Sequence, residues 1–219
     1  MLMRREGILL SKGSGNLPLT KKWLRENSRE HYHLLAVEEG YRSRAAYKLL
    51  QISEKYELIK PGDVVIDLGA APGGWMQAAR TLSGEKGCVL GIDLKEIKAF
   101  KDPNITSIVA DVEMLAPADI VKQLPRRPDI VISDMSPNLS GVWSLDHMRQ
   151  LSLAQMALHL ATQLIPRGGN FLVKVFQGER YKAFMDETKQ RFKQVRTVKP
   201  KASRSESAEM YLVCLGFKG

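Results

Sequence analysis

Short apolar runs rich in β-branched residues recur along the chain from Pro61 onward. Five of them cover Val64–Asp67, Cys88–Asp93, Ile105–Ala110, Asp129–Ser133 and Asn170–Phe176. Helical patterns lie between most of these runs, and the longest spans Leu145–Leu164. Nearly continuous apolar strands that alternate with helices are typical of a parallel sheet covered on both faces. The pattern therefore predicts an α/β fold.

Two further apolar runs, Val195–Val198 and Met210–Leu215, follow a helical pattern around Arg180–Phe192. A loop of roughly ten residues joins the two runs, which is too short for the crossover that a parallel pair needs. We therefore expect the last two strands to be antiparallel within an otherwise parallel sheet.

The segment ahead of Pro61 has a different character. Residues 20–60 look helical, with an apolar stripe formed by Leu49, Leu50, Ile52 and Leu58. Ser43 is in position to cap the helix that contains Lys48. Residues 1–18 are polar, and we interpret them as a flexible tail or an expression remnant. We expect residues 19–219 to form a single domain whose basic helical extension covers about residues 19–60.

Composition narrows the class of protein. The chain has 219 residues and a formal net charge of +9. This charge favours a polyanionic partner, although a solvated basic surface explains it equally well. The two cysteines, Cys88 and Cys214, lie in apolar runs, and no stretch has the length of a signal core or a membrane span. We expect a cytoplasmic protein that has reduced thiols and does not enter the membrane.

A glycine-rich turn follows the first apolar run, within the sequence DLGAAPGGW at residues 67–75. The spacing of Gly69 to Gly74 does not fit the dinucleotide fingerprint G-x-G-x-x-G. Asp93 ends the second run, where it can bind ribose hydroxyls, and Asp111 follows the third, where it can meet an adenine amino group. Either aspartate alone is more often a turn residue. In this order at three successive strand ends, the set resembles the cofactor site of class I methyltransferases.

Five ordered motifs extend this resemblance: RSRAAYK at 42–48, DLGAAPGGW at 67–75, SDMSPNLSG at 133–141, VKVFQG at 173–178 and SRSESAEMY at 203–211. From about Trp23 to Gly216 the chain resembles the FtsJ family of RNA ribose 2′-O-methyltransferases. The resemblance implies a class I, Rossmann-like fold with a mostly parallel seven-stranded sheet, an antiparallel last pair and helices on both faces. It also implies S-adenosylmethionine as the cofactor.

The resemblance assigns site residues by motif. The catalytic tetrad of the family falls on Lys48, Asp134, Lys174 and Glu209. Glu206 lies close to Glu209, but Glu209 directly precedes the final strand, as the family pattern requires. The cofactor contacts fall on Gly69, Gly73, Trp75, Asp93, Asp111 and Asp134.

Lys174 has the chemistry that methyl transfer to a hydroxyl needs. A ribose hydroxyl becomes a good nucleophile only as its proton leaves, so a base must lie within hydrogen-bond reach. Lys174 sits inside the apolar run FLVKVF, where desolvation and the cation of Lys48 would favour a neutral amine. The alternative is that Lys174 only forms a structural ion pair with Asp134.

Basic residues lie on both sides of the tetrad members in sequence, and the first group is interleaved with aromatic residues. We expect RNA phosphates to contact Lys21, Lys22, Arg25, Arg42, Arg44, Lys201 and Arg204. Each of these side chains alone is more often a solvated surface charge. The four histidines have no metal-ligand spacing, and we expect no metal.

The function predicted from the resemblance is 2′-O-methylation of a uridine in large-subunit ribosomal RNA, by a monomer that acts on 23S-type RNA within the large ribosomal subunit. Methylation of a tRNA anticodon loop is the alternative. A nicotinamide-dependent oxidoreductase and a non-catalytic RNA-binding module are more distant. The missing G-x-G-x-x-G counts against the first of these, and the intact tetrad counts against the second.

Overall fold

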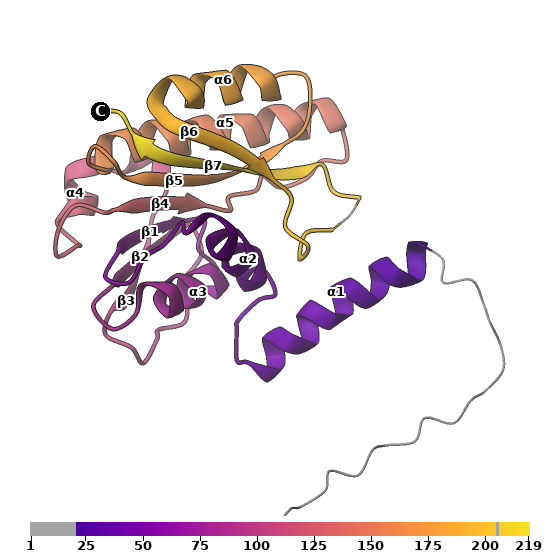
Figure 1. Ribbon diagram of the computed structural model, residues 1–219, viewed down its shortest axis with the longest axis horizontal. Helices are drawn as coiled ribbons and strands as arrows, with labels where there is room; N and C mark the ends of the chain where they lie inside the picture. The colour runs from indigo at the N-terminus through magenta and orange to yellow at the C-terminus, as the bar shows by residue number, and fades with distance from the viewer. Residues whose placement is uncertain (1–20, 205) are drawn as a thin grey trace, which may run out of the picture.

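The computed structural model describes residues 21–204 and 206–219, with side chains from Glu30 onward. Within these residues, seven strands form one sheet in the order β3-β2-β1-β4-β5-β7-β6 (Figure 1). The strands are β1 (Val64–Leu68), β2 (Cys88–Asp93), β3 (Ile105–Val109), β4 (Ile130–Ser133), β5 (Asn170–Phe176), β6 (Phe192–Val198) and β7 (Glu209–Phe217). Residues 1–18, which the sequence analysis interpreted as a flexible tail or an expression remnant, lie outside the described residues.

The pairing directions confirm the predicted fold class. Strands β3, β2, β1, β4 and β5 are mutually parallel, whereas β7 runs antiparallel to both β5 and β6. β2 and β5 have the predicted bounds, and β6 begins three residues earlier than predicted, at Phe192. Phe192 is buried in the core beside Phe171, so the strand starts as soon as helix α6 (Tyr181–Arg191) ends.

Alternation along the strands produces two cores, one on each face of the sheet. Ile66, Leu68 and Val173 pack with α5 (Trp143–Leu164), α6 and the short α4 (Pro117–Val121). Val65 and Leu172 belong to the opposite core, which α2 (Ala46–Tyr56) and α3 (Gly74–Ser83) cover. The central strands are therefore buried on both faces, as a doubly covered sheet requires.

The helix α1 (Lys21–Glu38) extends away from this body (Figure 1). The C-terminal half of α1 packs through Tyr32, Leu35 and Ala36 against Tyr47 of α2 and Ala202. Leu34 and Val37 face outward with 60% and 68% of their surface exposed. No helix in the described part of the chain is both long and apolar enough to cross a membrane.

The predicted cap of α2 is wrong. The helix begins at Ala46, and its N-cap residue Ala45 has helical dihedral angles and no side-chain cap hydrogen bond. Ser43 lies a turn earlier, where its carbonyl accepts from the Ala46 amide at 3.2 Å. Its hydroxyl instead packs so tightly on Gly74 that a Cβ there would overlap it. Ser43 therefore joins the start of α2 to the start of α3 through packing.

The strand order reverses at β1, which has β2 on one side and β4 on the other. In an open α/β sheet, such a reversal leaves a crevice outside the carboxyl ends of the strands, and ligands bind there. The chain leaves β1 through a turn in which Gly69 has a φ of +77°. A Cβ on Gly69 would lie 2.6 Å from Cγ of Met135, which follows β4. The close approach of the β1 and β4 loops therefore depends on glycine.

We predict that Gly69→Ala lowers the free energy of unfolding by about 1–3 kcal/mol more than Gly62→Ala does. Both glycines have a positive φ, at +77° and +89°, so both variants carry the left-handed strain of a Cβ. Only Gly69 has an atom in the way, since a Cβ at Gly62 meets nothing within 4 Å. Urea unfolding of both variants measures the difference. Equal losses would mean that the Met135 loop moves aside freely.

Candidate active site

The register of β5 and β7 brings the first two groups of the site together. Lys174 of β5 lies directly opposite Tyr211 of β7. Both side chains point into the face covered by α2 and α3, and they are 5% and 0% exposed. A lysine this buried needs a partner, because removing an ammonium from water costs several kcal/mol per ion.

Asp134, immediately after β4, is that partner. The Nζ atom of Lys174 lies 3.1 Å from Oδ1 of Asp134 and donates a hydrogen bond of 2.6 Å to the carbonyl oxygen of the same residue. The phenol of Tyr211 donates to Asp134 Oδ1 at 2.7 Å. One carboxylate thus holds two buried side chains from neighbouring strands.

Lys48 extends this network from helix α2, which covers the same face of the sheet. Its Nζ donates to the Tyr211 hydroxyl at 3.0 Å and to Oε1 of Glu209 at 2.7 Å. Ser203 also donates to Glu209 Oε1, at 2.8 Å. The four predicted tetrad residues therefore form one connected chain from Glu209 through Lys48 and Tyr211 to Asp134 and Lys174. Glu206, the alternative to Glu209, is exposed.

The charges in this network shift the acid–base behaviour of its members. Burial alone would raise the pKa of Asp134, but Lys174, Lys48 and the Tyr211 hydrogen bond outweigh it and hold that pKa below its ordinary value. Burial raises the pKa of Tyr211 well above its ordinary value, and the negative charges of Asp134 and Glu209 raise it further. Asp134 is thus a stable anion and Tyr211 a stable neutral donor.

The predicted cofactor residues line the neighbouring strand ends. The indole nitrogen of Trp75 donates to the Ala45 carbonyl at 2.7 Å, and its ring lies 5.8 Å from that of Tyr211. Trp75 is buried and holds the start of α3 against α2. Gly73, with a φ of +107°, ends the turn between β1 and α3, and a Cβ there would lie 2.7 Å from the ring of Phe100.

The two acids stand at the ends of β2 and β3. Asp93 is half-buried, and its oxygens accept from the Ala71 amide at 2.9 Å and the Lys95 amide at 2.8 Å. Asp111 is exposed and accepts from the Glu113 amide at 3.0 Å. Both therefore have the turn contacts of ordinary loop aspartates, and Asp93 also ties the β2 end to the glycine-rich turn.

A comparison of the sequence with protein families decides which family this arrangement belongs to. The FtsJ-like methyltransferase family model matches residues 41–217. The chain belongs to the FtsJ-like methyltransferase family. The sequence-based resemblance to this family is confirmed, and the protein is a methyltransferase.

Individual relatives agree with the family model. A protein of Methanococcus maripaludis named ribosomal RNA large subunit methyltransferase E is 47% identical over 203 residues, which cover 91% of this chain and 78% of the relative. A protein of the same name from Methanothermobacter thermautotrophicus is 46% identical, and the match covers 91% of this chain and 95% of the relative. The crystal structure of a Plasmodium falciparum protein titled a ribosomal RNA methyltransferase has a TM-score of 0.71 and 30% identity, covering 82% of this chain and all of that one.

Two residues of this methyltransferase site were missed by sequence reasoning. Tyr211 lies within a recognised motif, and its two-residue spacing from Glu209 in a strand was the available signal. Asp67 of β1 is completely buried, and neither of its carboxylate oxygens has a hydrogen-bond partner among the described residues. Burial raises its pKa well above the ordinary value, and Asp134 and Asp93 raise it further. Such a buried acid, with no partner among the described residues, is unusual, because buried polar groups are nearly always hydrogen-bonded.

The predicted RNA-binding residues of the methyltransferase have varied surroundings. The Arg42 guanidinium lies 3.6 Å from the centre of the Phe100 ring and donates to the carbonyls of Pro72 at 3.2 Å and Ala99 at 3.1 Å. Arg42 therefore clamps the glycine-rich turn, and a phosphate contact by it stays a prediction. Arg44 is half-buried and has interactions within the protein.

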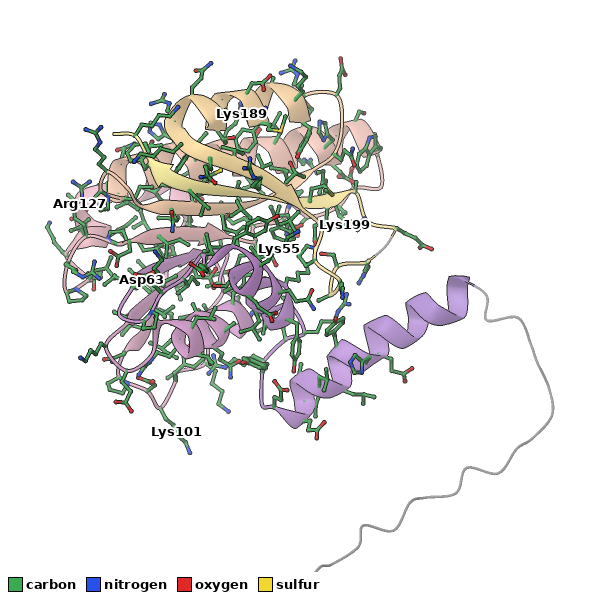
Figure 2. The ribbon with its side chains drawn as sticks, viewed as in Figure 1. Lys55, Asp63, Lys101, Arg127, Lys189 and Lys199 are labelled. Carbon is green, nitrogen blue, oxygen red and sulfur yellow. The ribbon has the colours of Figure 1, made fainter. Side chains whose placement is uncertain are left out.

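The remaining RNA candidates belong to two segments, the loop between β6 and β7 and helix α1. Lys201 and Arg204 are exposed in the loop between β6 and β7, close to Lys199 (Figure 2). Lys199 itself donates to the Ser207 carbonyl at 2.6 Å, which braces this loop just before Glu209. Lys21, Lys22 and Arg25 belong to α1, but their side chains lie outside the described ones. Among the described residues, no three His, Cys, Asp or Glu side chains are grouped as metal ligands.

We predict that Tyr211→Phe lowers the free energy of unfolding by about 1–3 kcal/mol near neutral pH, because Asp134 loses a buried hydrogen bond. This loss should shrink as the pH falls. The pKa of Asp134 is depressed in the folded state, so its contribution is present above the unfolded value of about 3.9 and is lost as the pH falls through the folded value.

Tyr181→Phe is the matched control. The Tyr181 hydroxyl is 2.6 Å from Thr197 Oγ1, on the outer strand and away from any carboxylate of the site. The decrease in the free energy of unfolding caused by Tyr181→Phe should be nearly constant between pH 7 and pH 3. Urea unfolding at several pH values measures both variants. A Tyr211→Phe loss that is equally constant would mean that Asp134 does not depend on this phenol.

Proposed function

We propose that this methyltransferase transfers the methyl group of S-adenosylmethionine to a ribose 2′-hydroxyl of large-subunit ribosomal RNA. The observation that carries the proposal is the buried Lys174 amine, fixed by Asp134 at the carboxyl end of β5. This is the crevice end of the sheet, where a methyl donor and its acceptor must meet. A primary amine in this place is the kind of base that a hydroxyl acceptor needs.

The residues at the neighbouring strand ends fit S-adenosylmethionine. Asp93 and Asp111 offer carboxylates to a ribose and to an adenine amino group. The apolar side chains that follow them, Leu94 and Met114, are 70% and 84% exposed, and an adenine ring would cover them. Asp67 of β1, whose carboxyl oxygens have no hydrogen-bond partner among the described residues, is a further feature that a cationic or hydrogen-bonding ligand would satisfy.

Each protein group then has a defined task. The cofactor, when bound, would supply an electrophilic methyl group. Lys174, as the uncharged amine, would accept the proton of the 2′-hydroxyl at its Nζ atom as the hydroxyl oxygen becomes the nucleophile. Asp134 orients that amine, and its negative charge complements the cationic sulfonium. Lys48 and Glu209 hold the ribose and keep Tyr211 pointed at Asp134.

Ribosomal RNA is favoured as substrate by the relatives, two of which are named ribosomal RNA large subunit methyltransferase E. The net charge of +9 suits a polyanion. Within this proposal, a uridine is the methylated nucleotide and the assembled large subunit is the partner of a monomeric, cytoplasmic enzyme. A tRNA anticodon loop is the second candidate, because the same tetrad serves any ribose hydroxyl.

The base is tested by Lys174→Ala and Lys174→Arg. Lys174→Ala should lower the single-turnover rate of methyl transfer by about 10²–10⁴, as loss of a general base does, while cofactor and RNA affinities stay close to those of the unmodified protein. Lys174→Arg should be as inactive, because a guanidinium does not give up its proton near neutral pH.

The arginine variant separates catalysis from structure. Arginine preserves a cation beside Asp134, so a purely structural ion pair would be rescued by it. The measurement is methylation of ribosomal RNA with saturating labelled cofactor, in parallel with separate binding titrations. Near-normal rates for Lys174→Arg would show that this position supplies positive charge only.

Cofactor binding is tested at Asp93. Asp93→Ala should weaken S-adenosylmethionine binding, because each lost hydrogen bond to a charged acceptor is worth about 1.5–3 kcal/mol. Asp93→Asn should have an intermediate effect, since it keeps one acceptor for the Ala71 amide. Asp102→Ala is the matched control, because Asp102 pairs with Arg80 at 2.6 Å ahead of β3, at the opposite end of the strands. Calorimetric titration that gives Asp93→Ala and Asp102→Ala the same affinity would refute the assignment.

A further inference from the structure

An apolar patch adjoins the site and contains none of the tetrad or cofactor residues. Its members lie between residues 139 and 148, on the loop after Asp134 and the first turn and a half of α5. The patch consists of Leu139, Val142, Trp143, Leu145 and Met148, which are between 40% and 67% exposed. Apolar side chains exposed this closely together usually mark a place where another molecule binds.

Trp143 is the best-fixed member of this patch. Its ring lies 5.9 Å from that of His147 at an angle of 23° and 6.1 Å from that of Phe176 at 16°, so the three rings are nearly parallel. His147 is buried, and Gly178 packs on it so closely that a Cβ there would lie 2.6 Å from the imidazole. Trp143 therefore rests on a rigid support while 52% of its own surface stays exposed.

The loop that leads to Trp143 is held in place as well. Asp146 accepts hydrogen bonds from the amide and hydroxyl of Ser140, both at 2.8 Å, and from the Gly141 amide at 3.1 Å. Because Asp146 lies in the first turn of α5, it ties the loop to the helix that carries the indole. The exposed ring is thus oriented before any partner arrives.

The stack of rings begins next to the proposed base. Phe176 lies two residues after Lys174 on β5, which is about 6.5 Å along a strand. Gln150 of α5 donates to the Lys174 carbonyl at 3.0 Å, so the helix carrying Trp143 is anchored to the same strand position. A group that stacks on Trp143 would therefore lie at the same end of β5 as a ribose held at Lys174.

The charges around the patch favour an RNA base over an apolar protein segment. Arg149 follows the patch on α5, and Arg180 lies two residues after Gly178, which supports His147; both side chains are exposed. An exposed aromatic ring with exposed arginines nearby in the sequence, on a chain of net charge +9, suits the binding of single-stranded nucleic acid.

We propose that the exposed part of the Trp143 ring stacks on a base of the substrate RNA near the methylated nucleotide. This inference rests on the proposed function for the identity of the ligand as RNA. A flat ring fits a base because every base presents a π face, so the contact adds affinity and positions the strand without reading sequence. Trp143 would then be a positioning residue, distinct from the groups that perform the transfer.

The test compares Trp143→Ala, Trp143→Phe and Leu145→Ala. The probe is a fluorescein-labelled single-stranded RNA oligonucleotide of mixed sequence, alongside an abasic oligonucleotide with the same sugar–phosphate backbone. Trp143→Ala should weaken binding of the base-bearing RNA by roughly 5- to 150-fold and leave binding of the abasic strand unchanged. Trp143→Phe should retain most of the affinity. Leu145→Ala removes exposed apolar surface without removing a ring and should have little effect.

Tryptophan emission gives a second readout that a merely structural role would not change. Binding of the base-bearing RNA should quench the emission of the unmodified protein, and most of this quenching should be missing in Trp143→Phe, which keeps the ring stack. S-adenosylmethionine affinity should be the same in all variants, which checks that they are folded. In methylation assays the alanine variant should raise KM for RNA far more than it lowers kcat.

Equal RNA affinity for Trp143→Ala and the unmodified protein would overturn the inference. A loss of similar size in Leu145→Ala, or on the abasic strand, would also overturn it, because the patch would then act as a general apolar or protein-docking surface. These outcomes leave the proposed function intact. The proposed function instead fails if the unmodified protein binds RNA but transfers no methyl group to ribose.

Discussion

The pairing of Lys174 with Asp134 is the interaction on which the site depends. A lysine amine in the middle of an apolar sheet is tolerated only because one carboxylate lies 3.1 Å away and the carbonyl of the same residue accepts a hydrogen bond. The pKa of Asp134 lies below its ordinary value, which favours the charged carboxylate near neutral pH. Removing the Asp134 side chain would leave the buried Lys174 amine without its carboxylate partner, so the fold and the proposed chemistry share one constraint.

The topology of the sheet brings the residues of this pair, and the rest of the network, together. β4 and β5 are parallel neighbours, so their carboxyl ends deliver Asp134 and Lys174 to the same edge. The antiparallel β7 enters from the opposite direction, and its first residues, Glu209 and Tyr211, therefore meet the same edge. A parallel β7 would begin at the far end of the sheet and bring neither of them. Lys48 completes the network from α2, which α3 and Trp75 hold in place.

The sequence was sufficient for the parts that depend on local pattern. Apolar periodicity predicted the strands, and the short loop between residues 198 and 209 predicted the antiparallel pair. The resemblance predicted which four charged residues would meet. It could not predict that Tyr211 joins Lys48 to Asp134, or that Asp67 has no hydrogen-bond partner among the described residues. Both features depend on tertiary packing and not on sequence spacing.

Ser43 and Arg42 both have partners in the fold that the sequence did not reveal. Ser43 was predicted to cap a helix, but tight packing on Gly74 fixes it before that helix begins. Arg42 was expected to reach RNA, and its guanidinium is already engaged by Phe100 and two carbonyls. In both cases the sequence suggests one role for a polar residue. The fold then gives its side chain a partner that is distant in the sequence. The exposed Trp143 is the reverse case, since an isolated tryptophan in a sequence gives no sign that it will remain at the surface.

The central claim is that these groups methylate a ribose 2′-hydroxyl of large-subunit ribosomal RNA. The most direct measurement is a map of 2′-O-methylation across ribosomal and transfer RNA from cells with the gene, without it, and with the gene restored. We predict that one position in the large-subunit RNA loses its methyl group in the deletion and regains it when the gene is restored. Identical maps, or a lost methyl group that lies in a tRNA, would contradict this account.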